Sequence, residues 1–344
     1  MSNALVSLLD ITKRKGGDKE VGLLEDTIIY APELSAVMGR PIDGTQYKTI
    51  HRTLPTVAFR QANNGSDTLK GQYRQSLHEC ALIDGQLQAD TAVVDAIATG
   101  TGPESDVDGD ILFDEAQGVI QGMYITVGAQ MYYGVANDAN GFGGMAPFVG
   151  SLNAATNTTP VCVGAGGTGV SSAYLVWENI RGAHFIFGKN RGLTMFPEWR
   201  VQQVNGANSK PLTALVNNIQ GWLGFAINHP LSIARLANAD TANSHPITDS
   251  LIAKLLSYLP LQMLAEANAN LNMGGPNKFG PGLKIFMNPI QFYGLQNSRT
   301  PVASGGATAL TAATPLQYPR MDLVSNGIPI VLTNSITNSE AVVA

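Results

Sequence analysis

Residues 44–84 constrain the fold most, because they predict a long two-stranded hairpin that has no core of its own. Side chains alternate along GTQYKTIHRTLPTVAFRQ with a period of two, which indicates a strand. The run NNGSD supplies turn residues that accept positive φ, and LKGQYRQSLHECALID returns as a second strand. A lone two-stranded hairpin is at best marginally stable in water. We therefore expect this mostly polar hairpin to rest on a neighbouring molecule or on an edge of its own subunit.

A low fraction of charged residues favours an assembled protein over a free monomer. Charged side chains make up 14% of the 344 residues and apolar side chains 44%, whereas soluble proteins carry about 25% charged residues. So few charges do little to keep a large surface monomeric. The net charge is −5, and Lys13-Arg14-Lys15 is the one basic cluster of the sequence. Because tight nucleic-acid binding needs many phosphate contacts, such binding is not expected.

The cysteines and the apolar runs argue against a disulfide framework and a membrane span. Cys80 and Cys162 lie far apart and form no CxxC pair, which fits assembly in a reducing, intracellular compartment. No apolar run reaches the ~18 residues that a spanning helix needs. Charged residues from Asp10 onward interrupt the N-terminal apolar stretch, so no signal peptide is expected.

The rest of the chain predicts a mixture of helices and strands. Residues 1–19 predict a mobile arm. In the long helix expected over 111–134, Gly118 and Gly122 are expected to permit close packing against a neighbouring element. The other expected elements are one or two short helices over 20–38, a helix over 86–101, a β-rich section to about residue 238, a helix with Thr248 as its N-cap that Pro260 interrupts, a buried strand over 283–289 that leads into a helix, a loop over 299–315 and a terminal strand over 327–337.

A GxGxxG pattern at Gly164, Gly166 and Gly169 is the strongest suggestion of an enzyme. A dinucleotide site needs these glycines to open a helix whose N-terminus holds the pyrophosphate. The run that follows, VSSAYLVW, is typical of a strand, and no βαβ pattern surrounds it. A plain glycine-rich loop is therefore the better interpretation.

An acidic run at Asp106, Asp108 and Asp110 suggests a calcium loop, but an EF-hand would need glycine and glutamate where Ile111 and Gln117 stand. These carboxylates fit better as a cap for the helix expected from residue 111. The five histidines show no zinc-binding spacing, and no nucleophile–base motif is present. We therefore predict no catalytic, cofactor-binding or metal-binding residues.

A series of short fragments within residues 171–240 resembles a block in the major capsid proteins of tailed phages. In order, these fragments are Trp177, Gly182, Phe187-Gly188-Lys189, Gly192-Leu193, Gly221-Trp222, Gly224 and Arg235-Leu236-Ala237-Asn238. PELSAVMGRPIDGTQYKT, LPTVAFR, LKIFMNP and GIPIVLT support the likeness elsewhere in the chain. His229-Pro230 departs from the pattern, where a more basic segment would be expected. The order of the fragments is similar to that of a short-tailed-phage coat protein with the Hong Kong 97 fold.

The resemblance implies an α+β fold with an N-terminal arm, an extended hairpin called the E-loop, a peripheral domain with a long spine helix, and an axial domain. The implied boundaries are 1–43 for the arm, 44–85 for the E-loop, 86–160 for the peripheral domain with its spine helix at about 111–134, 161–320 mainly for the axial domain with returns to the peripheral domain, and 321–344 for the C-terminal strand and tail.

The resemblance also implies a function, that of a major capsid protein which assembles as hexamers and pentamers into the icosahedral head of a phage. Implied partners are further copies of the chain, a portal, a decoration protein, and double-stranded DNA through weak non-specific contact; no membrane and no cofactor is implied. Because no folded scaffolding segment fits before residue 44 and the sequence begins with Met1, we expect a separate scaffolding protein. A tail or tube protein, and a soluble nucleotide-binding enzyme that uses Gly164–Gly169, are the alternatives.

Polar and aromatic side chains of the hairpin are the candidates for contact between subunits. They are Tyr47, Lys48, His51, Arg52, Arg60, Lys70, Tyr73 and Arg74.

Overall fold

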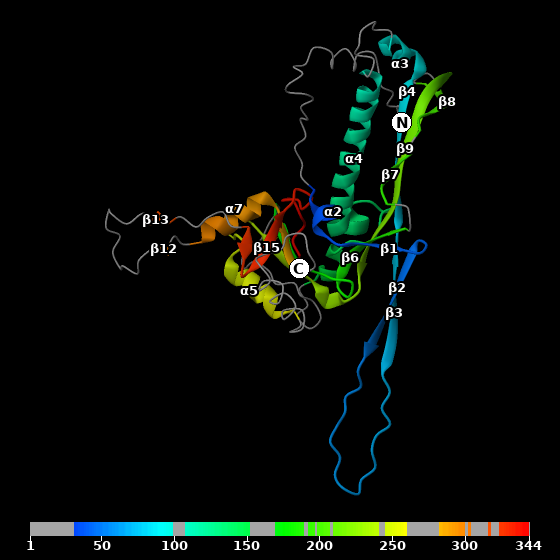
Figure 1. Ribbon diagram of the computed structural model, residues 1–344. Coiled ribbons are helices and arrows are strands. Elements are labelled where there is room, and N and C mark those ends of the chain that lie inside the picture. Colours follow the sequence, from blue (N-terminus) through cyan, green and yellow to red (C-terminus); the bar gives the residue numbers. More distant parts are fainter. Residues whose placement is uncertain are drawn as a thin grey trace.

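The computed structural model describes residues 31–98, 107–151, 169–188, 192–196, 198–206, 209–240, 245–259, 282–299, 302–303, 316–317 and 323–343. These residues form a body built on a large mixed sheet, with a long helix beside it and a hairpin that extends away from it (Figure 1). The architecture is α+β, as the sequence predicts.

An 11-stranded sheet forms the centre of the body. Its main path runs β14-β15-β11-β5-β6-β9-β4, with β1 beside β6, β10 beside β5, and β7 and β8 beside β9. The strands are β1 (Gly39–Ile42), β4 (Ala81–Asp90), β5 (Ser171–Glu178), β6 (Ala183–Gly188), β7 (Thr194–Met195), β8 (Arg200–Asn205), β9 (Pro211–Ile227), β10 (Ile233–Ala239), β11 (Gly282–Met287), β14 (Val324–Ser325) and β15 (Ile328–Leu332). β9 is 17 residues long and pairs with β4 on one side and with β8, β7 and β6 on the other, so it joins the two ends of the body.

Helices cover both faces of the central strands. They are α2 (Glu33–Ala36), α3 (Thr91–Ala98), α4 (Val107–Tyr133), α5 (Asp249–Ser257) and α7 (Pro289–Ser298), with short 3-10 turns at Gly134–Ala136, Ala146–Val149 and Pro230–Ser232. A separate two-stranded pair is formed by β12 (Val302–Ala303) and β13 (Leu316–Gln317).

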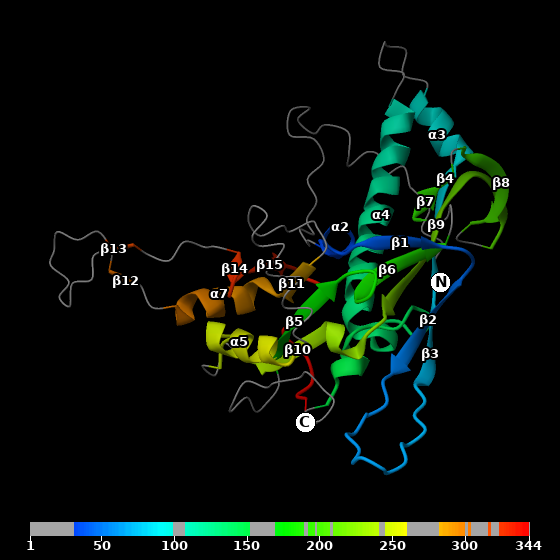
Figure 2. The same ribbon diagram turned by 60° about the horizontal axis from the view of Figure 1, so that its bottom comes forward.

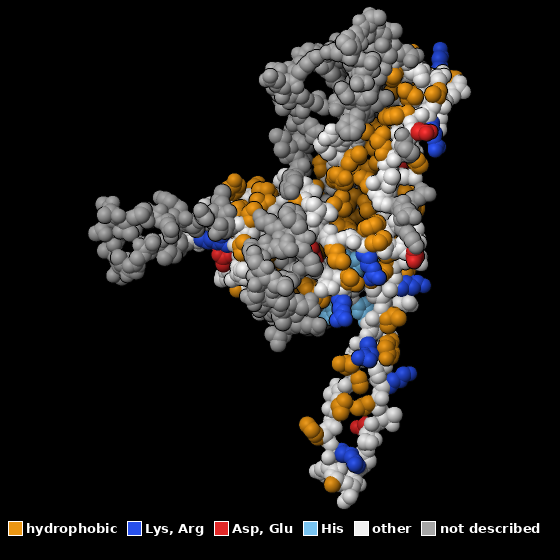
Figure 3. Space-filling model, in the orientation of Figure 1, with side chains coloured by type: hydrophobic (Ala, Val, Ile, Leu, Met, Phe, Trp, Pro, Cys, Tyr) orange, Lys and Arg blue, Asp and Glu red, His pale blue; other side chains and the backbone are white. Residues whose placement is uncertain are grey.

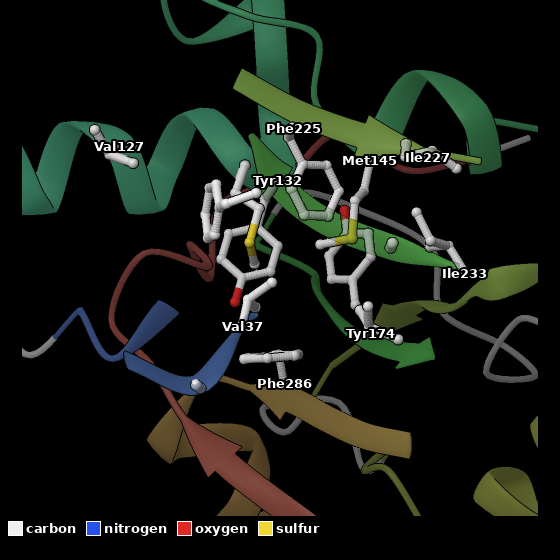
Figure 4. Close-up of a cluster of buried hydrophobic side chains, with 14 of the residues drawn as sticks. Val37, Val127, Tyr132, Met145, Tyr174, Phe225, Ile227, Ile233 and Phe286 are labelled. Atoms are coloured by element: carbon white, nitrogen blue, oxygen red, sulfur yellow. The ribbon is translucent and has the colours of Figure 1, made fainter. Parts of the chain in front are cut away.

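Alternate residues of β5 enter two different hydrophobic clusters. Leu175 and Trp177 pack in the cluster that contains α5 and α7, whereas Tyr174 and Val176 face the cluster beside α4. Figure 4 shows the second cluster, where Tyr174 lies near Phe286 and other apolar side chains from several elements. A strand that is buried on both faces is apolar along nearly its whole length, which explains the run that follows Gly169.

One predicted helix is observed with a different start, and the first part of another is a strand. The predicted long helix is observed as α4, but it begins at Val107, so Asp108 and Asp110 lie inside its first turn and not before it; Asp106 lies outside the described residues. The prediction of helix over 86–101 is wrong for residues 86–90, which continue β4 in register with β9. Pairing with a strand more than a hundred residues away overrides local helix propensity here.

The expected role of Gly118 and Gly122 is wrong within the subunit. A Cβ atom added at either position would meet no described atom within 4 Å. The close approach is made by Gly85 on β4, where a Cβ atom would lie 2.5 Å from Met123 Cε and 3.0 Å from Val119 Cγ1. A glycine of the strand therefore lets α4 lie close against the sheet.

Most predicted elements of the C-terminal half are confirmed where the structure describes them, but residues 302–303 of the predicted loop form β12, and the terminal strand ends at Leu332 and not at residue 337. Thr248 caps α5 by accepting a hydrogen bond from the Leu251 amide, 3.3 Å away. Asn288 caps α7 through the Ile290 amide, directly after the buried strand β11. β15 lies within the predicted terminal strand. The interruption at Pro260 and most of the predicted 299–315 loop lie outside the described residues.

Buried polar contacts fasten both ends of the described chain to the body. Glu33 of α2 is fully buried and accepts a hydrogen bond from Thr333, and β1 pairs with β6. Near the C-terminus, Glu340 lies 3.0 Å from the Arg235 guanidinium and accepts a hydrogen bond from the Tyr133 hydroxyl at 2.7 Å. Residues 31–42, part of the implied arm, therefore pack against the body of the same subunit, and residues 1–30 lie outside the described part.

Candidate assembly interface

The predicted hairpin is present as an antiparallel pair, β2 (Gln46–Thr53) and β3 (Gln72–Glu79), joined by the loop 54–71. It points away from the body in both ribbon views (Figures 1 and 2). The strands are shorter than the sequence predicts, because pairing ends at Thr53, just before Pro55, which has no backbone N–H to donate. Asn63 takes a φ of 69° in the predicted turn.

Tyr47 anchors the base of the hairpin to its own subunit. Its hydroxyl accepts a hydrogen bond from Arg40 Nη1 at 3.0 Å, and the Arg40 guanidinium lies 5.3 Å from the centre of its ring. The His184 ring packs edge-on against it, with 5.6 Å between ring centres. Tyr47 is therefore held against the body of its own subunit.

One face of the hairpin is wholly exposed and carries apolar side chains. Lys48, Ile50 and Arg52 of β2 lie on this face, opposite Leu77, Gln75 and Tyr73 of β3. We call these six residues the outward face. Ile50 is 73% exposed and Tyr73 68% exposed, and no described part of the subunit covers them. Large exposed apolar groups of this kind mark interaction sites when they gather in one region.

The loop at the end of the hairpin adds further exposed apolar groups. Val57 is 75% exposed, and Phe59 has no cover at all, at 108%. The mostly polar composition of the hairpin did not predict these exposed apolar groups. The signal was present, since the alternation of β2 already places Ile50 and Leu54 on the side of Lys48.

The remaining contact candidates are spread along the hairpin and form no single cluster. The exposed ones are Lys48, Arg52, Arg60, Lys70, Tyr73 and Arg74, whereas His51 is half-buried. The Arg60 guanidinium donates a hydrogen bond to the backbone carbonyl of Asn64 and so helps to order the loop. These candidates are therefore spread along the length of the hairpin.

Histidines gather at the base of the hairpin although they lie far apart in sequence. Burial lowers the pKa of His184 to about 4, and the nearby Arg40 and His78 charges lower it further, whereas a hydrogen bond that the imidazole donates to the Asn179 backbone acts in the opposite direction. Burial, followed by the charge of His51, also lowers the pKa values of His78 and His229. The folded subunit therefore favours neutral imidazoles around Tyr47.

Acidification is expected to destabilise the folded subunit through these histidines. Because their folded pKa values lie below the usual 6.5, their contribution to stability is present above pH 6.5 and is lost as the pH falls toward about 4 for His184. The melting temperature of His184→Phe, measured across this range, should fall less with pH than that of the parent. His245→Gln, outside the cluster, is the control. Equal pH dependence of His184→Phe and the parent would contradict this assignment.

The described residues give little support to metal binding, a membrane-spanning helix or a nucleotide site. No group of three or more His, Cys, Asp or Glu side chains there could hold a metal ion, and no described helix is both long and apolar enough to span a bilayer. Gly169 leads into the strand β5 and not into a helix, which removes the phosphate-binding element that a nucleotide site would need. Gly164 and Gly166 lie outside the described part of the chain.

Comparisons with known proteins place the chain among capsid proteins. A family model described as "Major capsid protein GP7" matches residues 43–344, and no curated protein matches the chain. Over 100% of this chain and 98% of the other, the structure is similar to that of bacteriophage Epsilon15, a short-tailed phage, with a TM-score of 0.71 and 19% identity. A capsid structure of bacteriophage JBD30, decorated with minor capsid protein trimers, gives a TM-score of 0.46 and 10% identity over 95% of this chain and 98% of the other.

Two residues of the fragment Arg235-Leu236-Ala237-Asn238 hold the C-terminal tail in the structure. Arg235 holds Glu340 of the C-terminal tail, and Asn238 exchanges two hydrogen bonds with the backbone of Val343, at 2.8 and 2.9 Å. The family is one of structural proteins, so the chain is not an enzyme and the nucleotide-binding alternative is set aside. The match over residues 43–344, together with the whole-chain similarity to the Epsilon15 structure, shows that this chain belongs to the major capsid protein GP7 family and has the Hong Kong 97 fold.

Proposed function

We propose that this major capsid protein, which forms the shell of a phage head, assembles as hexamers and pentamers through its hairpin, the outward face of which lies against an adjacent subunit. One observation carries the proposal: Ile50, Tyr73 and Leu77 are exposed together on a face of the hairpin that no described part of its own subunit covers. Burial of such groups contributes about 25 cal/mol per Å² of apolar surface. A contact repeated from copy to copy can close into a symmetric shell.

The domain roles follow from the same proposal. The hairpin 44–85 would be the E-loop, 1–43 the arm, α4 the spine helix of a peripheral domain over 86–160, and 161–320 mainly the axial domain, followed by the strand and tail at 321–344. The support is the position of each segment in the fold: the hairpin that extends from the body, the long helix α4 beside the central sheet, and the lobe that holds α5 and α7.

The proposed partners, besides further copies of the chain, are a separate scaffolding protein, a portal, a decoration protein and packaged double-stranded DNA. Family membership supports the first three. For DNA, the 14% charged fraction and the net charge of −5 support contact that is weak and non-specific.

Replacing Ile50, Tyr73 and Leu77 together with threonine is expected to leave the subunit folded and to reduce shell formation sharply. Threonine suits a strand, and the three side chains are already exposed, so circular dichroism and the melting temperature should hardly change. Burying an Ile or Leu side chain contributes about 1.5–3 kcal/mol, so the loss at every hairpin contact is large. Sedimentation velocity should show that the variant remains unassembled at concentrations where the parent forms shells.

The matched control removes exposed apolar groups outside the hairpin, as Val135→Thr, Ile180→Thr and Val201→Thr. This control should assemble more readily than the hairpin variant. Assembly of the hairpin variant at the parent's concentration would show that the outward face is not a major contact.

A further inference from the structure

The hairpin and the rest of the chain carry opposite net charge. Residues 44–79 contain five Lys or Arg residues and two Asp or Glu residues, a net charge of +3. The whole chain has a net charge of −5, so the remainder carries −8. A basic hairpin on an acidic body favours contact between the hairpin of one copy and the body of another, since complementary charge steers association and sets its register.

A groove beside α4 has the composition that such a contact needs. Its lining includes the apolar side chains of Leu82 on β4, Val127 on α4, Leu223 on β9 and Phe142, together with the polar Asp138 and Asn140. The groove holds about 420 Å³ of empty space, part of it open to solvent. Leu82 remains 47% exposed. Figure 3 shows hydrophobic side chains gathered over α4 and the strands beside it, above the base of the hairpin.

The hairpin of the same subunit does not reach this groove. Leu82 follows directly after the base of the hairpin, and the pairing from Gln46–Glu79 to Thr53–Gln72 carries the loop away from it. At about 3.4 Å per residue, the paired strands alone place the loop roughly 24 Å from the base. Both ribbon views show the hairpin pointing away from the body (Figures 1 and 2). A second copy of the chain must therefore supply the occupant.

The loop at the end of the hairpin carries two side chains that match the lining of this groove. Phe59 is fully exposed, and Arg60 follows it. Arg60 uses one donor on the Asn64 carbonyl, and a guanidinium has five N–H donors in all. Asp138 Oδ1 accepts a hydrogen bond from the Asn140 amide, and a carboxylate retains further acceptor sites. Phe59 and Arg60 thus present an aromatic ring beside a cation, and the groove presents apolar side chains together with the Asp138 carboxylate.

We propose that Phe59 of one copy inserts into the α4 groove of the adjacent copy and that Arg60 pairs with its Asp138. This inference rests on the proposed function and names the receptor for the hairpin. Because donor and receptor are different surfaces, the contact runs head to tail and closes into a ring when the rotation between copies permits.

Cysteine crosslinking tests the contact in assembled shells. Ala58→Cys and Asn140→Cys, both exposed, place thiols beside the two surfaces without removing Phe59, Arg60 or Asp138. A short bismaleimide should join copies into a ladder that ends at a covalent ring. The control pairs Ala58→Cys with Gln202→Cys on β8, and the unchanged chain accounts for Cys80 and Cys162. Absence of the ladder in assembled shells of the first pair overturns the inference.

A double-mutant cycle gives a second measurement that needs no cysteine. Arg60→Gln and Asp138→Asn should each raise the concentration required for assembly, and the double variant should raise it no further than the larger single effect. The Asn side chain keeps the oxygen that accepts from the Asn140 amide. Additive effects would overturn the pairing. If shells need the hairpin but neither test finds this groove, only the inference fails; if shells form without the hairpin, the proposed function fails with it.

Discussion

Replacing residues 49–76 with a short Gly/Ser linker is expected to give a folded subunit that forms no closed shells. The four hydrophobic clusters of the body contain no residue of this segment, and Tyr47 remains to hold the base. Circular dichroism should stay close to that of the parent apart from the lost strands. Sedimentation and electron microscopy, with the full chain prepared in parallel, should find discrete subunits or small oligomers.

Two outcomes of this excision would contradict the account. Unfolding of the subunit would show that the hairpin belongs to its own core and that the E-loop assignment is wrong. Normal shells would show that the hairpin is not a major contact between copies.

Replacing Lys284 with methionine is expected to lower the free energy of unfolding by about 3–5 kcal/mol, the usual cost of removing one partner from a buried ion pair. Lys284 is fully buried on β11, with Nζ 2.7 Å from Glu178 Oε2 and a further hydrogen bond to the Ala36 carbonyl. Without the lysine, the Glu178 carboxylate would stay in the interior without a counter-charge. Urea unfolding measures this loss, and the slope of the unfolding free energy against urea concentration should be the same for the variant and the parent.

The pH dependence of this variant follows from Glu178. Burial raises the pKa of its carboxyl to about 7, although the Lys284 charge lowers it. The pKa of Glu178 is higher in the folded state than the value near 4.5 of the unfolded chain. The group therefore stabilises the fold fully below pH 4.5, and this stabilisation is lost as the pH rises through about 7. The deficit of Lys284→Met should therefore be smaller at pH 5 than at pH 8. The exposed Lys254→Met is the control, expected within about 0.5 kcal/mol of the parent; an equal effect of both substitutions would contradict the structural role of the pair.

Local patterns predicted the elements whose signals lie close together in the chain. The hairpin, the two-sided strand β5 and the Thr248 cap were all visible as alternation, apolar runs or capping residues. β1 and residues 86–90 of the predicted helix were missed as strands, because each is a strand only through pairing with β6 or β9, far away in sequence.

The sequence predicted the position of the hairpin but not the apolar side chains on its exposed face. The charged residues of the hairpin were among the predicted contacts, whereas the exposed Phe59 and Ile50 were not. The composition of the hairpin is mostly polar, and composition does not show which side each residue faces. No sequence spacing could have gathered His78, His184 and His229, since the fold alone brings them to the base of the hairpin. The capsid function itself came from the resemblance, because composition and patterning indicated no more than an assembling structural protein.

A three-dimensional reconstruction of the purified, self-assembled protein by electron cryomicroscopy tests the central claim most directly. The account predicts closed shells in which β2, β3 and the loop 54–71 of each copy lie on the adjacent copy, with the outward face buried. Open tubes, or shells in which each hairpin packs only against its own subunit, would contradict it.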